Sequence, residues 1–314
     1  MPNSERFPLT LAHTAATLYY LHDATQAEIA ERLGTSRATV SRLLREARDR
    51  GLVRIEVLPL PVEDTPELAE RLRTGLGLQQ VTLCPATSAA HVAEAVSPTV
   101  GAVLSEVGLH PGDVLLVSSG RTVHEIAERE LPALPGVVVA PMVGGQDEPE
   151  AWYQTNEITR RIAVGVGGTP RFLHAPAFPG HALRRSLVED PEFQRFEQLW
   201  HGARCALMGV GAPPLRRESI PGFVPTEQEP LRRAVGDVVS RFYDADGVEV
   251  SYAGADRLIA IPLAVLREVP VRIAVAYGDL KVPSIVAGAR GGCFTHLVTD
   301  PATASGLLTL LEEQ

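Results

Sequence analysis

Arginine and short hydroxyl side chains, which suit hydrogen bonding to nucleic acids, are concentrated in residues 36–54 of this chain. Arg37–Arg54 contains six arginines and two acidic residues, a local charge of +4, whereas the whole chain carries a formal charge of −9. A guanidinium fork matches the acceptor edge of guanine, and serine or threonine hydroxyls reach phosphates and base edges. One basic stripe on an otherwise acidic chain therefore predicts contact with double-stranded DNA through this segment.

Helical spacing and capping signals predict how this segment is positioned. Residues 11–21 repeat apolar side chains at helical spacing, and Thr25 starts a capping box that opens a second helix. Gly34 supplies the turn, and Thr35 or Ser36 caps a third helix that is expected to run to about residue 50. The spacing of small, glycine and aliphatic residues is typical of a helix-turn-helix.

The outward face of the third helix carries the predicted DNA contacts. These are Ser36, Arg37, Ala38, Thr39, Ser41, Arg42 and Arg45. Early positions of a recognition helix lie deepest in the major groove, so Arg37 and Arg42 are expected to read guanine, each giving about 1–3 kcal/mol of discrimination. The alternative is a helical module that docks proteins with a solvated arginine face; spacing, caps and local charge together favour DNA.

Composition shifts divide the chain into two predicted domains. We predict a helix-turn-helix domain at residues 1–58, winged-helix-like because residues 52–60 alternate as a strand does, a proline-rich linker at 59–66 and a larger domain at 67–314. In the larger domain, helical stretches alternate with short apolar runs that begin at residues 81, 113, 136, 171, 205, 272 and 293. Runs without polar alternation indicate a parallel sheet covered by helices, an α/β fold.

Several of these runs end in glycine-rich turns, of which SSGRT at 118–122 is the most suggestive. Ligands of open α/β sheets bind at the carboxyl ends of strands. Hydroxyl and backbone N–H groups of Ser119, Gly120 and Thr122 suit a sugar or an anion, and Arg121 adds a fork of donors. An ordinary turn is the alternative that local sequence leaves open.

Lys281 is the one lysine in a chain with 29 basic residues. Every other basic position of the chain is arginine, so a lysine here indicates that a compact point charge is required. Chance retention is the alternative.

These segments occur in an order that resembles the SorC family of sugar-responsive regulators, a branch of the DeoR-like regulators, over nearly the whole chain. The elements are AEIAERLGTSRATVSRLLREARDRGLVRIEV, SSGRT, PMVGG, LMGVGAP, AVGDVVSRFYDADG and YGDLKVPSIVAGARGGCFTHLVTD. The resemblance implies a Rossmann-like α/β effector domain similar to sugar-phosphate isomerases of the glucosamine-phosphate deaminase type. It also implies a homo-oligomer, a dimer or tetramer, and a sugar, polyol or phosphosugar as effector.

The resemblance also implies the effector-binding residues. It places Ser119, Gly120, Arg121, Thr122, Gly144, Gly145, Gln146, Gly209, Gly211 and Lys281 at the ligand. Asp246 and Asp279 are added as acceptors for sugar hydroxyls, with turn residues as the alternative. Tyr277 stands where the family's GGxxK motif has its first glycine. For Trp152, packing in the core is favoured and stacking on a sugar is the alternative. Asn156 is expected to project into the pocket.

The rival function is an enzyme, a sugar-phosphate isomerase or deaminase with a DNA-binding appendage. Residues 207–214, LMGVGAPP, lack the Gly-His and acidic residue of the deaminases they resemble, so we expect no catalysis and no cofactor. Cys84, Cys205 and Cys293 are too scattered for a disulfide or metal pattern, so no metal is expected. No run approaches the roughly 20 apolar residues of a membrane helix and no signal peptide is evident, which predicts a cytoplasmic protein.

Overall fold

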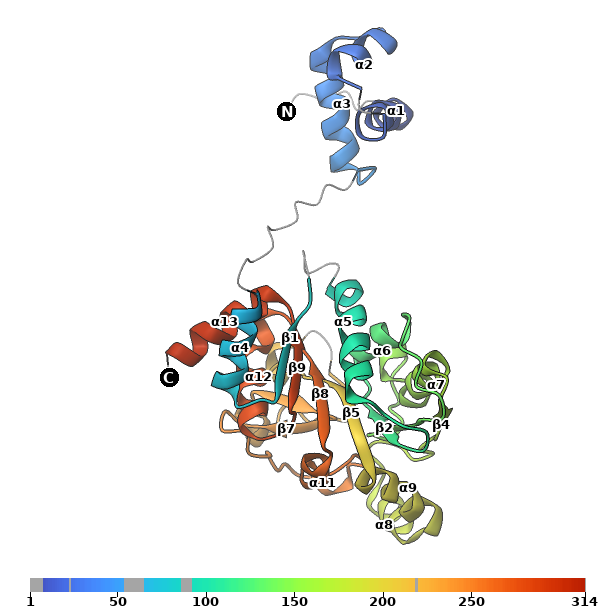
Figure 1. The fold of residues 1–314 in the computed structure, drawn as a ribbon, viewed down its shortest axis with the longest axis vertical. Helices are drawn as coiled ribbons and strands as arrows, with labels where there is room; N and C mark the ends of the chain where they lie inside the picture. The colour runs from blue at the N-terminus through green and yellow to red at the C-terminus, as the bar shows by residue number, and fades with distance from the viewer. Residues whose placement is uncertain (1–7, 23, 54–64, 86–91, 218–219, 314) are drawn as a thin grey trace. The chain divides into compact units, whose positions relative to one another are not determined.

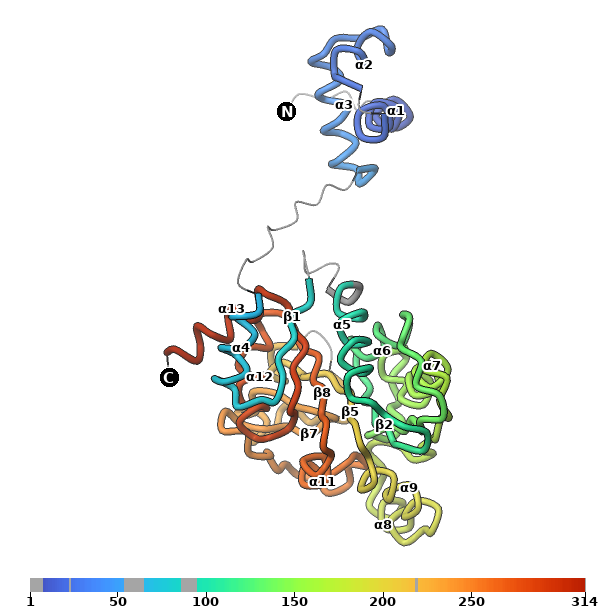
Figure 2. Tube along the Cα trace, in the orientation of Figure 1, coloured from blue at the N-terminus to red at the C-terminus, as the bar shows by residue number. Residues whose placement is uncertain are grey.

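A computed structural model gives the structure of the protein, traced in Figures 1 and 2. It describes residues 8–22, 24–53, 65–85, 92–217 and 220–313. The chain forms two compact units, residues 1–59 and 60–314.

The first unit is a three-helix bundle of α1 (Leu9–Tyr20), α2 (Gln26–Arg32) and α3 (Arg37–Asp49). The predicted capping box is present, with Thr25 and Glu28 exchanging hydrogen bonds at the start of α2. Gly34 has a φ of +60°, which a residue with a side chain rarely adopts, so it makes the turn into α3. Ser36 rather than Thr35 caps α3 by accepting from the Thr39 amide.

A small apolar core holds these helices together. Ile29 of α2 and Leu43 of α3 are fully buried, as is Ala15 of α1, and small alanines let the helices approach closely. The predicted strand at 52–60 lies almost entirely outside the described residues, and the described residues 52 and 53 form no strand.

The second unit is built on a seven-stranded parallel sheet in the order β1-β9-β8-β5-β2-β3-β4. Its strands are β1 (Gln80–Leu83), β2 (Val114–Val117), β3 (Val138–Pro141), β4 (Thr169–Pro170), β5 (Ala203–Gly209), β8 (Val271–Val275) and β9 (His296–Thr299). The order confirms the predicted α/β class. It also places the change in winding direction between β2 and β5, because the chain proceeds outward from each in opposite directions.

Helices cover both faces of this sheet, as the strands' uniform burial predicted (Figure 1). The helices are α4 (Thr65–Leu76), α5 (Val92–Val107), α6 (Arg121–Ala127), α7 (Thr155–Val166), α8 (His181–Glu189), α9 (Pro191–His201), α10 (Glu229–Arg232), α11 (Leu263–Glu268), α12 (Val282–Arg290) and α13 (Pro301–Glu312). One apolar core joins the sheet to α4, α9, α11, α12 and α13, and the other joins it to α5, α6 and α7. Successive side chains of a strand point to opposite faces of the sheet. Leu115 therefore packs in the second core and Leu116 in the first.

The structure differs from the sequence predictions in three places. Only residues 169–170 pair as β4, and the apolar run that begins at 171 forms no strand. The helix α4 begins at Thr65, so the end of the predicted linker is helical. A hairpin of β6 (Gly236–Val238) and β7 (Arg241–Tyr243) was not predicted, because each strand has only three residues. Among the described helices, none is long and apolar enough to cross a membrane.

Candidate effector site

A cavity of about 630 Å³ opens where β2, β5 and β8 end, at the predicted carboxyl edge of the sheet. It is lined by Ser118–Thr122, Gln146, Trp152, Tyr153, Gly209–Ala212, Arg216, Arg217, Pro221, Asp237, Val239, Ser240 and Tyr277–Lys281. The position is the switch point of the sheet, where the chains leaving β2 and β5 diverge and leave room for a ligand. The volume suits a small organic molecule.

Hydrogen bonds join the two turns at this switch point. The Gly209 amide donates to Ser118 Oγ at 3.3 Å, and Ser118 Oγ donates to the Ser119 carbonyl at 2.8 Å. Ser118 is buried, so its hydroxyl holds the turn after β2 against the end of β5 and leaves Ser119 to face the cavity.

Gln146 lines the cavity and carries a buried acceptor without a hydrogen-bond partner among the described residues. Its Nε2 donates to Ser119 Oγ at 2.9 Å, which fixes the orientation of the amide. Its Oε1 has no hydrogen-bond partner among the described residues, although the side chain is only 8% exposed. An unpartnered buried carbonyl costs about 1–3 kcal/mol, so this oxygen is suited to accept a hydrogen bond from a ligand hydroxyl.

Four cationic side chains line the cavity, those of Arg121, Arg216, Arg217 and Lys281. The Arg121 guanidinium lies 4.8 Å from the centre of the Trp152 ring, within the range of a cation–π interaction, and both residues line the cavity. Arg217 forms a largely buried ion pair with Asp237 and donates from Nε to the Ala212 carbonyl at 2.6 Å. Lys281 lines the same cavity, and no carboxylate of the described residues forms an ion pair with its ammonium.

Burial lowers the pKa of Lys281 to about 8, and the nearby Arg217 guanidinium acts in the same direction. The Nζ atom lies 5.3 Å from the centre of the Tyr277 ring. Burial also raises the pKa of Tyr277 to about 12, so its hydroxyl stays neutral. This hydroxyl donates a hydrogen bond to a carboxylate oxygen of Glu125 at 3.3 Å. The cavity therefore holds a partly desolvated lysine whose charge would be stabilised by an anion.

Gly211 is required by the ion pair rather than by a ligand contact alone. A Cβ on this residue would lie 2.0 Å from Asp237 Oδ1 and 2.3 Å from Arg217 Nη2. The β6–β7 turn beside it has two non-glycine residues at positive φ, Val239 at 49° and Ser240 at 64°. The Ser240 amide donates to Asp237 Oδ2 at 3.1 Å, which helps to hold this strained turn at the cavity wall.

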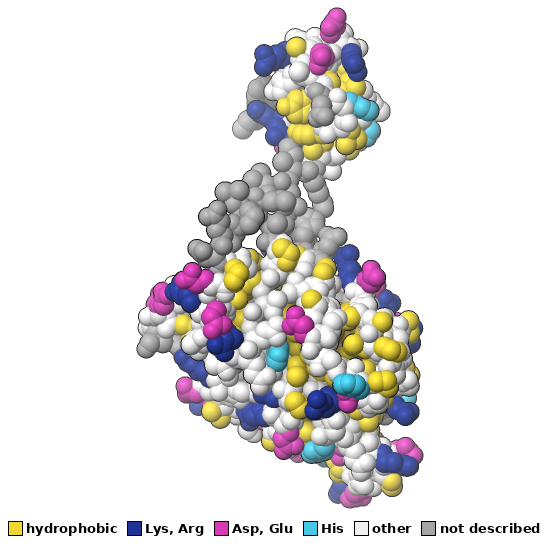
Figure 3. All heavy atoms as spheres, in the orientation of Figure 1, with side chains coloured by type: hydrophobic (Ala, Val, Ile, Leu, Met, Phe, Trp, Pro, Cys, Tyr) yellow, Lys and Arg dark blue, Asp and Glu magenta, His cyan; other side chains and the backbone are white. Residues whose placement is uncertain are grey.

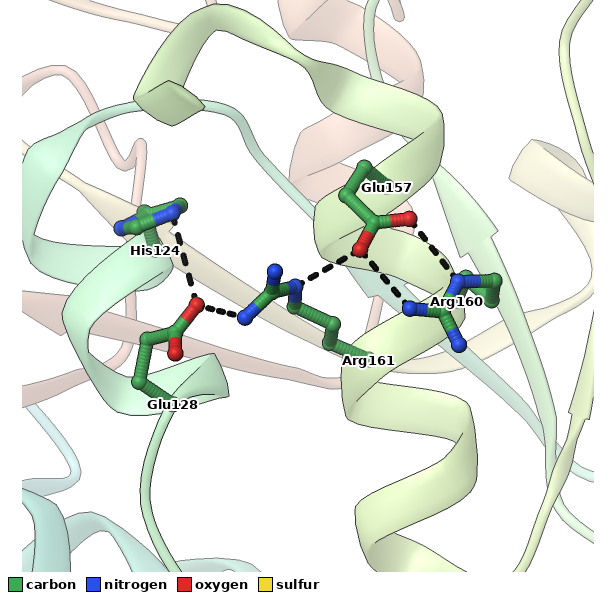
Figure 4. A network of polar contacts seen from close by, with 5 residues as sticks. All are labelled: His124, Glu128, Glu157, Arg160 and Arg161. Carbon is green, nitrogen blue, oxygen red and sulfur yellow. Dashed lines mark hydrogen bonds and ion pairs between the residues drawn. The ribbon is translucent and has the colours of Figure 1, made fainter. Parts of the chain in front are cut away.

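A surface network connects α6 and α7 (Figure 4). Arg161 of α7 contacts both Glu128 beyond α6 and Glu157 of α7, and Glu157 also pairs with Arg160 at 2.7 Å. The Arg160 hydrogen bond lowers the pKa of Glu157. Because these groups are partly exposed to solvent, each ion pair is expected to stabilise the protein little.

The structure brings most of the predicted effector residues together, but not all of them. Ser119, Gly120, Arg121, Thr122, Gln146, Gly209, Gly211, Asp279 and Lys281 line the cavity. Gly144, Gly145 and Asp246 do not. Gly144 and Gly145 bond to the backbone of residues 259 and 175, and a Cβ on Gly144 would lie 2.6 Å from the Ala175 carbonyl. Asp246 is exposed in the turn after β7.

Two further predictions are corrected by the side-chain contacts. Asn156 does not reach the cavity, because its amide exchanges hydrogen bonds with the backbone of Leu173 at 3.2 and 3.1 Å. Trp152 is a half-buried cavity residue rather than a core residue. Arg217 and Asp237 were missed, since nothing in their separate sequence positions indicates that they pair.

The DNA-facing predictions concern α3, where six of the seven residues are exposed. These are Ser36, Arg37, Ala38, Ser41, Arg42 and Arg45. Thr39 is half-buried, and its Oγ1 lies 2.9 Å from Ser36 Oγ, so both hydroxyls take part in the cap. On the face shown in Figure 3, acidic and basic side chains are interspersed over the second unit, so that face presents no comparable basic stripe.

Comparison with known proteins places both units. A family model described as a putative sugar-binding domain matches residues 60–309, and a MarR family model matches residues 9–59. The full-length sorbitol operon regulator SorC from Klebsiella pneumoniae superposes with a TM-score of 0.70 at 29% identity, over 96% of this chain and 99% of that one. The chain belongs to the SorC family of sugar-binding transcriptional regulators.

Curated relatives agree with this SorC-family assignment along the full chain. The deoxyribonucleoside regulator of Bacillus subtilis is 34% identical over 95% of this chain and 97% of its own length. The transcriptional regulator LsrR of Escherichia coli is 28% identical over 92% of each. The predicted helix-turn-helix followed by an α/β sugar-binding domain is confirmed, and the chain is a DNA-binding regulator controlled by a sugar effector, not an isomerase or deaminase.

Proposed function

We propose that this SorC-family regulator responds to a phosphorylated sugar or polyol, whose phosphate is bound among Arg121, Arg217 and Lys281. The observation that carries the proposal is the position of the lone lysine, half-buried beside Arg217 without a carboxylate partner among the described residues. The described lining holds four cations, including Arg216, against the carboxylates of Asp237 and Asp279, and Asp237 is already paired with Arg217, so the cavity retains excess positive charge. A phosphate dianion supplies the missing countercharge and several acceptors.

The other end of the ligand is proposed to be hydroxylated. Gln146 lines the cavity and its Oε1 lacks a hydrogen-bond partner among the described residues, and the partly exposed Trp152 ring offers an apolar surface for the C–H face of a sugar. Phosphate recognition at the cations and hydroxyl recognition at Gln146 together favour a phosphosugar over a simple anion or a neutral sugar.

Replacing Gln146 with leucine tests the hydroxyl contact. The wild-type protein should prefer one hydroxylated phosphosugar over its deoxy analogue by about 5–150-fold, since the deoxy compound leaves Oε1 unpartnered. Gln146→Leu should abolish that preference by weakening the hydroxylated ligand alone. Calorimetric titration with paired sugar phosphates and deoxysugar phosphates measures it. An unchanged preference in the variant would rule out the contact.

The pKa of Lys281 predicts how effector affinity depends on pH. With a pKa of about 8 in the free protein, the ammonium is mostly charged at pH 7 and mostly neutral at pH 9. A bound phosphate favours the charged form, so affinity should be greatest below pH 8 and fall about tenfold from pH 7 to pH 9. The ligand remains a dianion throughout this range, because its second pKa is about 6. Lys281→Arg should make affinity nearly flat over the same range.

We further propose that two or four chains in the cytoplasm present paired α3 helices to an inverted repeat with half-sites about 10 base pairs apart or a multiple of that spacing. Effector binding is proposed to change operator affinity about 5–150-fold through the oligomer.

The tests are a thermal-shift screen of sugars, polyols and their phosphates, followed by operator titration with and without each hit. A ligand at 100 times its dissociation constant should stabilise the protein by about 2.7 kcal/mol. If no phosphorylated compound stabilises the protein while a neutral sugar does, the phosphate assignment is wrong.

A further inference from the structure

A second hollow, of about 730 Å³, lies on the first unit beside the recognition helix. It is lined by Tyr19, Tyr20, Ala24, Thr25, Gln26, Ala27 and Arg37. The end of α1, the start of α2 and the first residue of α3 therefore meet at one concave surface.

Several polar groups at this hollow have no use within the described fold. Arg37 forms no ion pair or hydrogen bond with a described residue, and the same holds for the side chains of Tyr19 and Gln26. The Tyr19 and Tyr20 rings meet edge to face at 5.0 Å, which orients them. Thr25 differs, because its hydroxyl is engaged with Glu28 in the capping box at 2.9 Å. The hollow thus offers one cation and neutral hydrogen-bonding groups, and its described lining contains no carboxylate.

The position of Arg37 around α3 separates it from the centre of the reading face. At about 100° per residue, Ala38, Ser41 and Arg45 share the middle of the exposed face, and Arg37 and Arg42 lie about 140° apart at its two edges. Arg37 is on the edge that adjoins α1 and α2, because it lines the hollow with their residues.

The shape of a DNA duplex decides what this hollow can accept. Base edges lie on the floor of the major groove and are reached by side chains that project from an inserted helix. The sugar-phosphate backbones form the raised borders of the groove, so a concave surface beside that helix receives a backbone and not a base. Arginine, tyrosine and glutamine are all side chains that contact phosphates.

We propose that the hollow of Tyr19, Gln26 and Arg37 binds a DNA backbone phosphate that flanks the bases read by α3. Arg37 is thereby a positioning residue, and base discrimination belongs to the centre and the other edge of the face, with Ser41, Arg42 and Arg45. The proposal rests on the DNA-binding function of the chain and revises the expectation that Arg37 reads guanine.

The test compares two duplexes of equal length, one selected from a random pool by the wild-type full chain and one of scrambled sequence. Arg37→Ala should weaken binding to both by the same factor, about tenfold or more, and make the slope of log affinity against log salt less steep by about 1. Preference at each base pair of the selected site should be unchanged. Tyr19→Phe should weaken both duplexes equally without changing the slope, because it removes no charge.

Arg32→Ala is the matched control, since Arg32 is an exposed arginine of the same unit that does not line the hollow. It should leave the salt slope unchanged, and an equal change in both arginine variants would overturn the proposal. A loss of preference at one base pair in Arg37→Ala, or no loss of affinity at all, would also overturn it. Arg37→Lys keeps the charge and should restore the slope, and circular dichroism checks that each variant is folded. Failure of the wild-type chain to bind either duplex would contradict DNA binding itself, which separates the two claims.

Discussion

Replacing Lys281 with glutamine should weaken binding of a phosphorylated effector by about 10–150-fold, because one charge-assisted hydrogen bond of about 1.5–3 kcal/mol is lost. The same change removes a partly desolvated ammonium whose pKa is lowered to about 8. A lysine whose pKa is lowered by folding destabilises the folded state while its side chain is charged. Below pH 8, the unliganded variant should therefore melt at a higher temperature than the wild type. Thermal melting with and without ligand measures both effects.

The two effects of Lys281→Gln have opposite signs, which makes the result specific. General damage to the domain would lower both the unliganded melting temperature and the ligand-induced shift. Lys281→Arg serves as the control that keeps a positive charge, and it should retain much of the affinity while changing its pH dependence. Equal binding of a phosphosugar by the glutamine variant and the wild type would show that the phosphate lies elsewhere.

Replacing Asp237 with alanine should destabilise the second unit by about 3–5 kcal/mol, because it leaves the Arg217 guanidinium buried without its countercharge. The two side chains are only 15% and 12% exposed, so solvent screens the pair weakly. The same carboxylate also accepts from the Ser240 amide in the strained β6–β7 turn. Both tryptophans, Trp152 and Trp200, belong to this unit, so their fluorescence during urea unfolding reports its stability without a contribution from the helix-turn-helix.

A double variant separates the ion pair from simple loss of packing. Arg217→Leu with Asp237→Leu should cost less than Asp237→Ala alone, since no unpaired charge remains. Arg216→Ala is the matched control, because Arg216 is exposed and lines the same cavity without such a pair among the described residues. Loss of an exposed ion pair lowers the free energy of unfolding by about 1 kcal/mol or less. A loss of that size in Asp237→Ala would show that the Arg217–Asp237 pair does not stabilise the fold.

The Asp237 result would also bear on regulation. Gly211 has no room for a side chain because the Arg217–Asp237 pair passes it, so the pair, Gly211 and the β6–β7 turn form one wall of the effector cavity. Loss of the pair should therefore weaken effector binding and stability together, whereas Arg42→Ala on α3 should weaken operator binding and leave effector affinity intact.

Features that depend on neighbouring residues could be predicted from the amino-acid sequence alone. The capping box of Thr25 and Glu28 and the positive φ of Gly34 are interactions within one or two turns of chain, and both predictions are confirmed. The apolar runs predicted the parallel sheet, because a strand that is buried on both faces has apolar residues without polar alternation. The turn at 118–122 and the lone Lys281 were also identifiable in the sequence, and the structure places them at one cavity.

Contacts between segments that are distant in the sequence could not be predicted, because they depend on how the whole chain folds. The pairing of Arg217 with Asp237 depends on how the hairpin after α10 folds back over the end of β5, and no local pattern encodes that approach. The same cause removed Gly144 and Asp246 from the predicted site, since the glycine is used against the backbone at residue 175 and the aspartate faces solvent. Residue types and spacing fix local geometry through short-range sterics and hydrogen bonds, whereas contacts across the sheet follow from strand order.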